Sequence, residues 1–177
     1  MNRKVATILI LASLGSLGCA DSTSFVRADP ATQAQLTTMT SVYVSLPDDG
    51  TYEDKVYASS GKATASAIFA AFLERARSVR LAGQPEDRVT ALESARTGGE
   101  KVVAFSSILH WEDRATEWSG KPDRVRVHIE ILDVGTGQPL DAVTIEGKSG
   151  LGTFGGDHPQ DLLRAPIEAF VLSLYPN

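Results

Sequence analysis

The sequence predicts an α/β fold, in which a mixed, partly antiparallel sheet carries its helices on one face. Two patterns support this: stretches with a two-residue apolar period alternate with stretches whose apolar residues recur every three or four positions. The length of 177 residues, with 42% hydrophobic and 22% charged residues, is typical of one globular domain. The order strand-helix-strand-helix-strand-strand-strand-helix then favours helices packed against a sheet whose other face is polar and open.

The first half of the domain is expected to contain two strands and two helices. Residues 40–46 alternate between apolar and polar side chains and lead into a polar loop, 47–62. One apolar stripe predicts a helix over 63–80, and a short second strand begins at 79–82. Residues 86–97 form the second helix, which two glycines end. The stripe of the first helix consists of Ala65, Ile68, Phe69, Phe72, Ala76 and Val79.

The second half is expected to form three strands and the last helix. Residues 101–111 begin apolar on both faces, which is typical of a central strand. Residues 124–133 alternate cleanly, and a glycine-containing turn returns the chain as an antiparallel strand over 139–147. The last helix spans 159–175, and Pro166 either kinks it or begins it after a short turn. The open face is expected to carry Arg126, His128 and Glu130.

The N-terminus reads as a targeting signal. A short basic segment is followed by ten almost entirely apolar residues, 5–14, too few to span a hydrocarbon core of roughly 30 Å. A small residue then precedes Cys19, the only cysteine. This segment resembles a bacterial lipobox, which implies cleavage before Cys19 and acylation of its thiol. Ser16 replaces the usual leucine, so an ordinary secretory signal with a chance cysteine is the alternative.

The chain therefore divides into a signal peptide, 1–18, an acylated N-terminus with a flexible tether, 19–39, and one globular domain, 40–177. Twenty residues of coil would separate the domain from the membrane by roughly 25 Å, and by roughly 70 Å when extended. Known sorting rules imply delivery to the outer membrane, facing the periplasm, because Ala20 rather than an aspartate follows the cysteine. Asp21 leaves the inner membrane as the alternative.

Composition excludes several classes of function. The pI near 5.2 disfavours nucleic acid as a partner. Removing the signal leaves 15 basic against 22 acidic side chains, so a body of charge −7 is expected to depend on its covalent lipid for membrane attachment. One cysteine permits no internal disulfide and no cysteine-rich zinc site, and the three histidines lack metal-ligand spacing. No nucleophile motif occurs, so we expect no catalytic residue, metal or cofactor.

Two segments have the composition of binding loops. Residues 110–124 hold both tryptophans among many charges, and tryptophan is enriched at binding hot spots. The candidates there are Trp111, Arg114, Glu117, Trp118 and Lys121. In the alternative interpretation, Trp111 ends a strand facing the core and Trp118 packs over the sheet edge.

The second segment, 153–159, precedes the last helix. Its adjacent glycines permit unusual backbone angles, and amides near a helix start can bind an anion. The candidates there are Asp157 and His158. Asp157 is more simply a helix N-cap, with Pro159 in the first turn.

The segments 110–124, 133–137 and 155–163 together resemble a family of small proteobacterial lipoproteins carried as a domain of unknown function. The resemblance covers about residues 42–175 and implies no activity. The element order is also similar to envelope lipoproteins that activate peptidoglycan synthases and to the N-terminal domain of the Tol–Pal translocation protein.

The leading hypothesis is a non-enzymatic envelope lipoprotein that binds an envelope protein or a cell-wall component. Two alternatives remain open. One is a receptor for a small ligand or glycan, with Trp111, Trp118 and His158 lining a pocket. The other is a hydrolase that uses Glu112 or Glu117 with His158.

Overall fold

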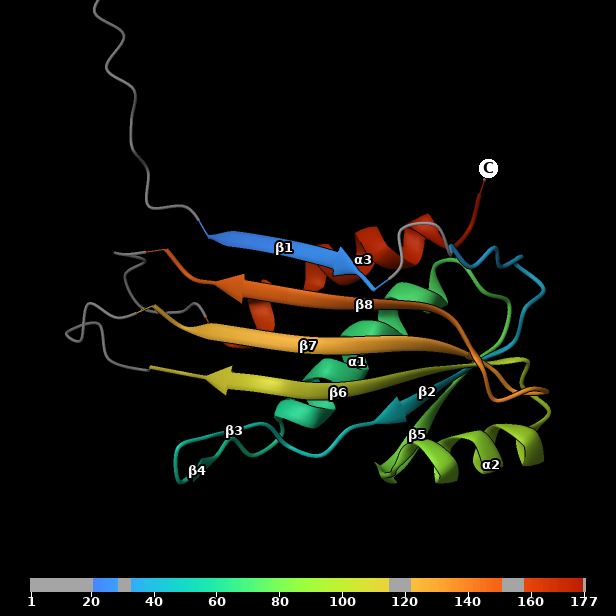
Figure 1. Ribbon diagram of the computed structural model, residues 1–177, viewed down its shortest axis with the longest axis horizontal. Coiled ribbons are helices and arrows are strands. Elements are labelled where there is room, and N and C mark those ends of the chain that lie inside the picture. Colours follow the sequence, from blue (N-terminus) through green and yellow to red (C-terminus); the bar gives the residue numbers. More distant parts are fainter. Residues whose placement is uncertain (1–20, 29–32, 115–121, 151–157, 177) are drawn as a thin grey trace, which may run out of the picture.

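The computed structural model describes residues 21–28, 33–114, 122–150 and 158–176. Its centre is a six-stranded sheet with the order β1-β8-β7-β6-β2-β5 (Figure 1). Strands β2, β5 and β6 are parallel, whereas β6, β7, β8 and β1 pair antiparallel. The six strands are β1 (Ser22–Arg27), β2 (Val42–Leu46), β5 (Val79–Pro85), β6 (Val102–Glu112), β7 (Arg124–Asp133) and β8 (Pro139–Lys148). The predicted mixed α/β sheet is therefore confirmed.

Helices α1 (Ser60–Leu73) and α3 (Arg164–Ser173) cover one face of the sheet and enclose the main core. The inward row of β7 supplies Val125, Val127, Ile129 and Ile131 to this core, as its alternation predicts. A two-stranded hairpin, β3 (Thr51–Tyr52) and β4 (Lys55–Val56), lies within the expected polar loop. No described helix is long and apolar enough to cross a membrane.

Helix α2 (Arg88–Gly98) packs on the opposite face, where the sequence analysis placed no helix. Its buried Ala91 and Ala95 join a second apolar cluster with Tyr43, Val103 and Leu132. The physical reason is the apolar character of β2 and β6 on both faces, which requires cover on both sides of the sheet. The open polar face is consequently limited to the half of the sheet formed by β1, β8, β7 and the end of β6.

The N-terminal segment departs most from expectation. Residues 22–27, expected within a flexible tether, form β1 at the sheet edge and pair with β8 from Ser22↔Lys148 to Arg27↔Val143. Arg27 donates from Nε to both carboxylate oxygens of buried Asp141, at 3.1 and 3.2 Å, and its guanidinium lies over the Phe170 ring. The sequence of β1 has no apolar face from which a strand could be predicted, and the strand is almost wholly exposed. The pairing with β8 and the Arg27–Asp141 ion pair hold it on the sheet.

The C-terminal segment follows the second of the two predicted courses. A short 3-10 helix, η1 (Pro159–Leu162), precedes α3, which begins two residues before Pro166. The proline lies in the first turn of α3, where its missing N–H removes no intrahelical hydrogen bond. Leu162 of η1 packs on Gly147 of β8, so η1 is fixed against the sheet.

Candidate functional site

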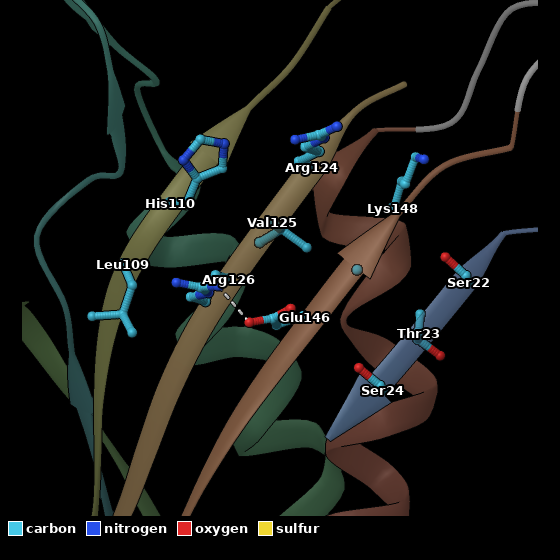
Figure 2. A pocket seen from close by; sticks show the side chains of 11 residues that line it. Ser22, Thr23, Ser24, Leu109, His110, Arg124, Val125, Arg126, Glu146 and Lys148 are labelled. Carbon is cyan, nitrogen blue, oxygen red and sulfur yellow. Dashed lines mark ion pairs between the residues drawn. The ribbon is translucent and has the colours of Figure 1, made fainter. Parts of the chain in front are cut away.

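A shallow groove of about 500 Å³ crosses the open face where β1 and β7 begin and β6 and β8 end. We call it the strand-end groove. Figure 2 shows its side chains on β1, β6, β7 and β8. Its lining comprises Ser22, Thr23, Ser24, Leu109, His110, Arg124, Val125, Arg126, Glu146, Gly147 and Lys148.

Two cations on neighbouring strands face each other in this groove. Arg124 of β7 lies directly opposite Lys148 of β8, and Ser22 of β1 lies on the other side of Lys148. Neither cation makes a salt bridge with any described residue. Like charges directly opposite across two strands destabilise a sheet. The arrangement therefore concentrates positive charge that an anion would neutralise.

The next row of the groove is neutralised internally. Arg126 pairs with Glu146 on β8, with 2.6 Å between Nη2 and Oε1, and both side chains are half exposed (Figure 2). The hydroxyl of Ser24 lies beside Glu146 in the register of β1. This row therefore separates the two cations from the remainder of the open face.

His110 closes the groove at β6. Its ring makes an edge-on contact with Tyr52, with 5.0 Å between the centroids. Burial lowers the pKa of His110 below its ordinary value of 6.5, and the positive charges of Arg124, Arg126 and Arg114 lower it further. Glu112 lies 3.4 Å away, but that carboxylate is already paired with Arg114.

A cluster of charged groups lies next to the groove at the ends of β6 and β7. The carboxylate of Glu112 is only 3% exposed and forms an ion pair with the guanidinium of Arg114. The backbone N–H of Arg114 donates to Asp123 Oδ1 at 2.6 Å, and the N–H of Asp123 donates to the Ser149 hydroxyl at 2.8 Å. These contacts fix the described ends of the 110–124 segment.

The two candidate binding segments meet in the described structure. Asp113 Oδ2 lies 3.7 Å from Nδ1 of His158, whose side chain is 52% exposed. His158 occupies the N-cap position of η1, and its backbone N–H donates to Asp161 at 3.0 Å. We call Glu112, Asp113, Arg114, Asp123 and His158 the loop cluster.

The structure separates the predicted site residues into three groups. Trp111 is 3% exposed in the main core, which confirms the alternative interpretation for that residue and removes it from the candidate binding surface. Arg114 and His158 belong to the loop cluster. Cys19, Glu117, Trp118, Lys121 and Asp157 lie outside the described residues.

Among described residues, no group of three or more His, Cys, Asp or Glu side chains could hold a metal ion.

Sequence reasoning missed Arg124, Lys148 and Ser22 as site residues. The first two could have been paired from the sequence, because the short turn after β7 fixes which residues of β7 and β8 face each other. Ser22 could not, because its place depends on β1. The hydroxyl side chains at the start of β1 line the groove because that strand pairs with β8.

The fold and the site define a small α/β protein with the strand-end groove on the open face of its sheet. Residues 34–174 match the family described as "Domain of unknown function (DUF4823)", and the chain belongs to this family. This confirms the resemblance to a family of unknown function. No curated protein matches the chain.

Solved structures with the same fold come from bacteria. Two structures of the PelC dodecamer from Paraburkholderia phytofirmans have TM-scores of 0.66 and 0.67 with 17% and 16% identity. The first alignment covers 89% of this chain and 99% of the PelC chain, and the second covers 88% and 100%. Protein XCC0632 from Xanthomonas campestris, of family DUF330, has a TM-score of 0.52 at 10% identity, covering 81% of this chain and 86% of its own. At these identities the likeness concerns the fold alone.

Proposed function

We propose that this protein is a lipid-anchored cell-envelope protein that acts as a non-enzymatic interaction module on the periplasmic side of a membrane. Acylated Cys19 provides the anchor, and the outer membrane is the site of attachment. The loop cluster provides the contact surface for an envelope protein or a cell-wall component. The carrying observation is the 3.7 Å approach of Asp113 and His158, which brings two separate segments into one surface.

The chemistry of the loop cluster supports recognition rather than catalysis. The carboxylate of Glu112 is engaged by Arg114, and that of Asp123 accepts a backbone N–H. A general acid or base must exchange its proton with a substrate, and carboxylates held in this way are poorly placed for it. Fixed charged groups around half-exposed His158 suit a rigid polar contact instead.

A second copy of this chain is one class of partner. The structures of PelC are of a dodecamer, and by that analogy the module would assemble with copies of itself. Here β1 is an edge strand whose outer backbone groups pair with no other described strand. Such an edge can accept a further strand.

The two alternative functions have less support. A receptor in which tryptophans stack on a ligand would need Trp111 at the surface, but this side chain is buried in the core. A hydrolase that uses Glu112 would need that side chain exposed to substrate, but it is buried against Arg114.

Crosslinking in intact envelopes tests the proposal. The full chain with a C-terminal affinity tag is treated with a short amine-reactive crosslinker and purified under denaturing conditions. The variant Trp118→Ala/His158→Ala removes two candidate contact residues without leaving buried Glu112 unpaired. The control Arg75→Ala/Leu172→Ala removes one cation and one apolar side chain, both of which are exposed and neither of which belongs to the loop cluster.

The wild type and the control should give the same crosslinked product, and the site variant should give at least about tenfold less. Equal yields from all three chains would contradict the assignment of the loop cluster. Absence of any crosslinked product from the wild type would contradict the interaction module itself.

A further inference from the structure

We propose that the strand-end groove receives the phosphate headgroups of anionic phospholipids in the membrane that holds the N-terminus. This inference rests on the proposed acylation of Cys19. It adds a second, non-covalent contact with the bilayer and fixes which end of the sheet faces it.

The first step is the reach of the chain between lipid and sheet. Asp21 is held to the sheet end because its Oδ1 accepts a hydrogen bond from the N–H of Gly150 at 2.9 Å. Consecutive Cα atoms are about 3.8 Å apart, so the Cα of Cys19 lies within about 8 Å of that of Asp21. A lipid on Cys19 therefore has one residue of spacer, Ala20, in place of the twenty-residue tether expected from composition.

The second step is the position of the groove relative to that point. Ser22 follows Asp21 and lines the groove, and Lys148 and Arg124 occupy the same row of the sheet (Figure 2). An acyl chain inserted in the bilayer at Cys19 must therefore bring this row to the level of the headgroups. The opposite end of the sheet, at the turn between β7 and β8, points away from that level.

The third step is charge complementarity. The mature chain has a charge of −7, but the lining of the groove itself holds three cations, Arg124, Arg126 and Lys148, and one acid, Glu146. The neighbouring acidic groups are engaged: Asp21 by Gly150, Glu112 by Arg114, and Glu146 by Arg126. Arg124 and Lys148 have no such partner among the described residues. A phosphate between them would relieve their mutual repulsion and could accept a hydrogen bond from the Ser22 hydroxyl.

The groove also offers a contact for the less polar part of a headgroup. Leu109, which is 55% exposed, lines it beside His110. An apolar side chain next to paired cations suits the glycerol and ester region below a lipid phosphate. A free phosphate ion would leave Leu109 without a contact.

Hydrogen–deuterium exchange tests this on the full-length chain purified in its membrane-processed form and reconstituted in vesicles. One preparation is phosphatidylcholine alone, and the other is three parts phosphatidylcholine to one part phosphatidylglycerol. Exchange is followed in β1 and in residues 143–148, with the core of β7 as an internal check of folding. The groove variant is Arg124→Gln/Lys148→Gln, and Lys62→Gln/Arg75→Gln is a control with the same loss of charge at exposed sites on α1 and just after it.

In the wild type and the control, phosphatidylglycerol should slow exchange in β1 and at the end of β8. Two cations near an anionic surface contribute about 30-fold in affinity, so the groove variant should show no such difference between the vesicles. The proposal is overturned if the wild type shows no difference or if the groove variant retains it. It is also overturned if inorganic phosphate added to phosphatidylcholine vesicles produces the same protection.

Intact mass of the same preparation reports acylation separately. A chain without a lipid on Cys19 would contradict the proposed anchor. Protection by phosphatidylglycerol vesicles in that unacylated chain would still support the groove, so the two failures are distinguishable.

Discussion

Asp21 accepts a hydrogen bond from the backbone N–H of Gly150, with 2.9 Å between Oδ1 and N. This contact joins the residue before β1 to the second residue after β8, which are 129 positions apart in the chain. The first described residue of the chain is thereby part of the folded domain. Cys19 is only two residues earlier, so the lipid proposed there would hold the sheet itself at the membrane.

The attachment of β1 is expected to depend on Arg27. Arg27→Ala leaves the carboxylate of Asp141 buried, 1% exposed, without its cation, which should lower the free energy of unfolding by about 3 kcal/mol. Urea denaturation measures the loss, and hydrogen exchange should show β1 released before the rest of the sheet. Arg164→Ala, which breaks an exposed pair with Glu168 on α3, should cause no measurable change. Equal effects of the two substitutions would show that Arg27 does not hold the strand.

Trp111 is expected to act in stability and not in binding. Trp111→Ala should cost about 3–5 kcal/mol of unfolding free energy, because it leaves a cavity in the main core beneath Gly50. Its neighbour Leu109 is exposed, so Leu109→Ala should change that free energy by less than about 0.5 kcal/mol. Chemical denaturation of both variants provides the comparison. A neutral Trp111→Ala would contradict the buried position.

The pH dependence of stability should carry the signature of His110. Its pKa is lowered in the folded chain by burial and by Arg124, Arg126 and Arg114, so the unfolded chain binds the proton more readily. The contribution of His110 to the free energy of unfolding is therefore fully present above about pH 6.5, and it is lost as the pH falls toward the pKa of the folded state. His110→Gln should flatten this part of the profile in urea denaturation at a series of pH values. An NMR titration should show the His110 pKa rising toward normal in Arg124→Gln, and an unchanged value would contradict the electrostatic account.

Gly147 is expected to allow the close packing of Leu162 in η1 against β8, and hence to fix the position of His158. A Cβ at this residue would lie 2.7 Å from Cβ of Leu162 and 3.0 Å from Cγ1 of Val125. Gly147→Ala should therefore cost about 1–3 kcal/mol in thermal or urea unfolding. Gly83→Ala provides the matched control, because a Cβ there meets no atom within 4 Å. Because alanine loses less backbone entropy than glycine when a strand forms, Gly83→Ala should leave the free energy of unfolding unchanged or raise it by about 0.5 kcal/mol.

The sequence predicted those elements whose side chains have a periodic pattern. The alternation of β7 correctly assigned Val127 and Ile129 to the core and Arg126 to the open face. The apolar start of β6 correctly indicated a central strand. It did not indicate which helix covers its second face, because that depends on the crossover that carries α2 over β2 to the far side of the sheet.

The site was less predictable because it depends on contacts between distant segments. Ser22–Arg27 has the composition of a tether, and only pairing with β8 and the Arg27–Asp141 contact, 114 positions apart, makes it a strand. The groove needs that strand for one of its sides. The approach of Asp113 to His158 likewise depends on η1 packing against β8 through Leu162. No local pattern encodes either relationship.

The lipid at Cys19 is the basis of the proposed membrane orientation, and the intact mass of the protein isolated from bacterial membranes tests for it most directly. We predict a chain that begins at Cys19 and is heavier than its amino acids by the attached acyl groups. Cys19→Ala should abolish this mass and prevent the processing. A chain with an unmodified Cys19, or one recovered from the periplasmic fraction with a different first residue, would contradict the anchored orientation.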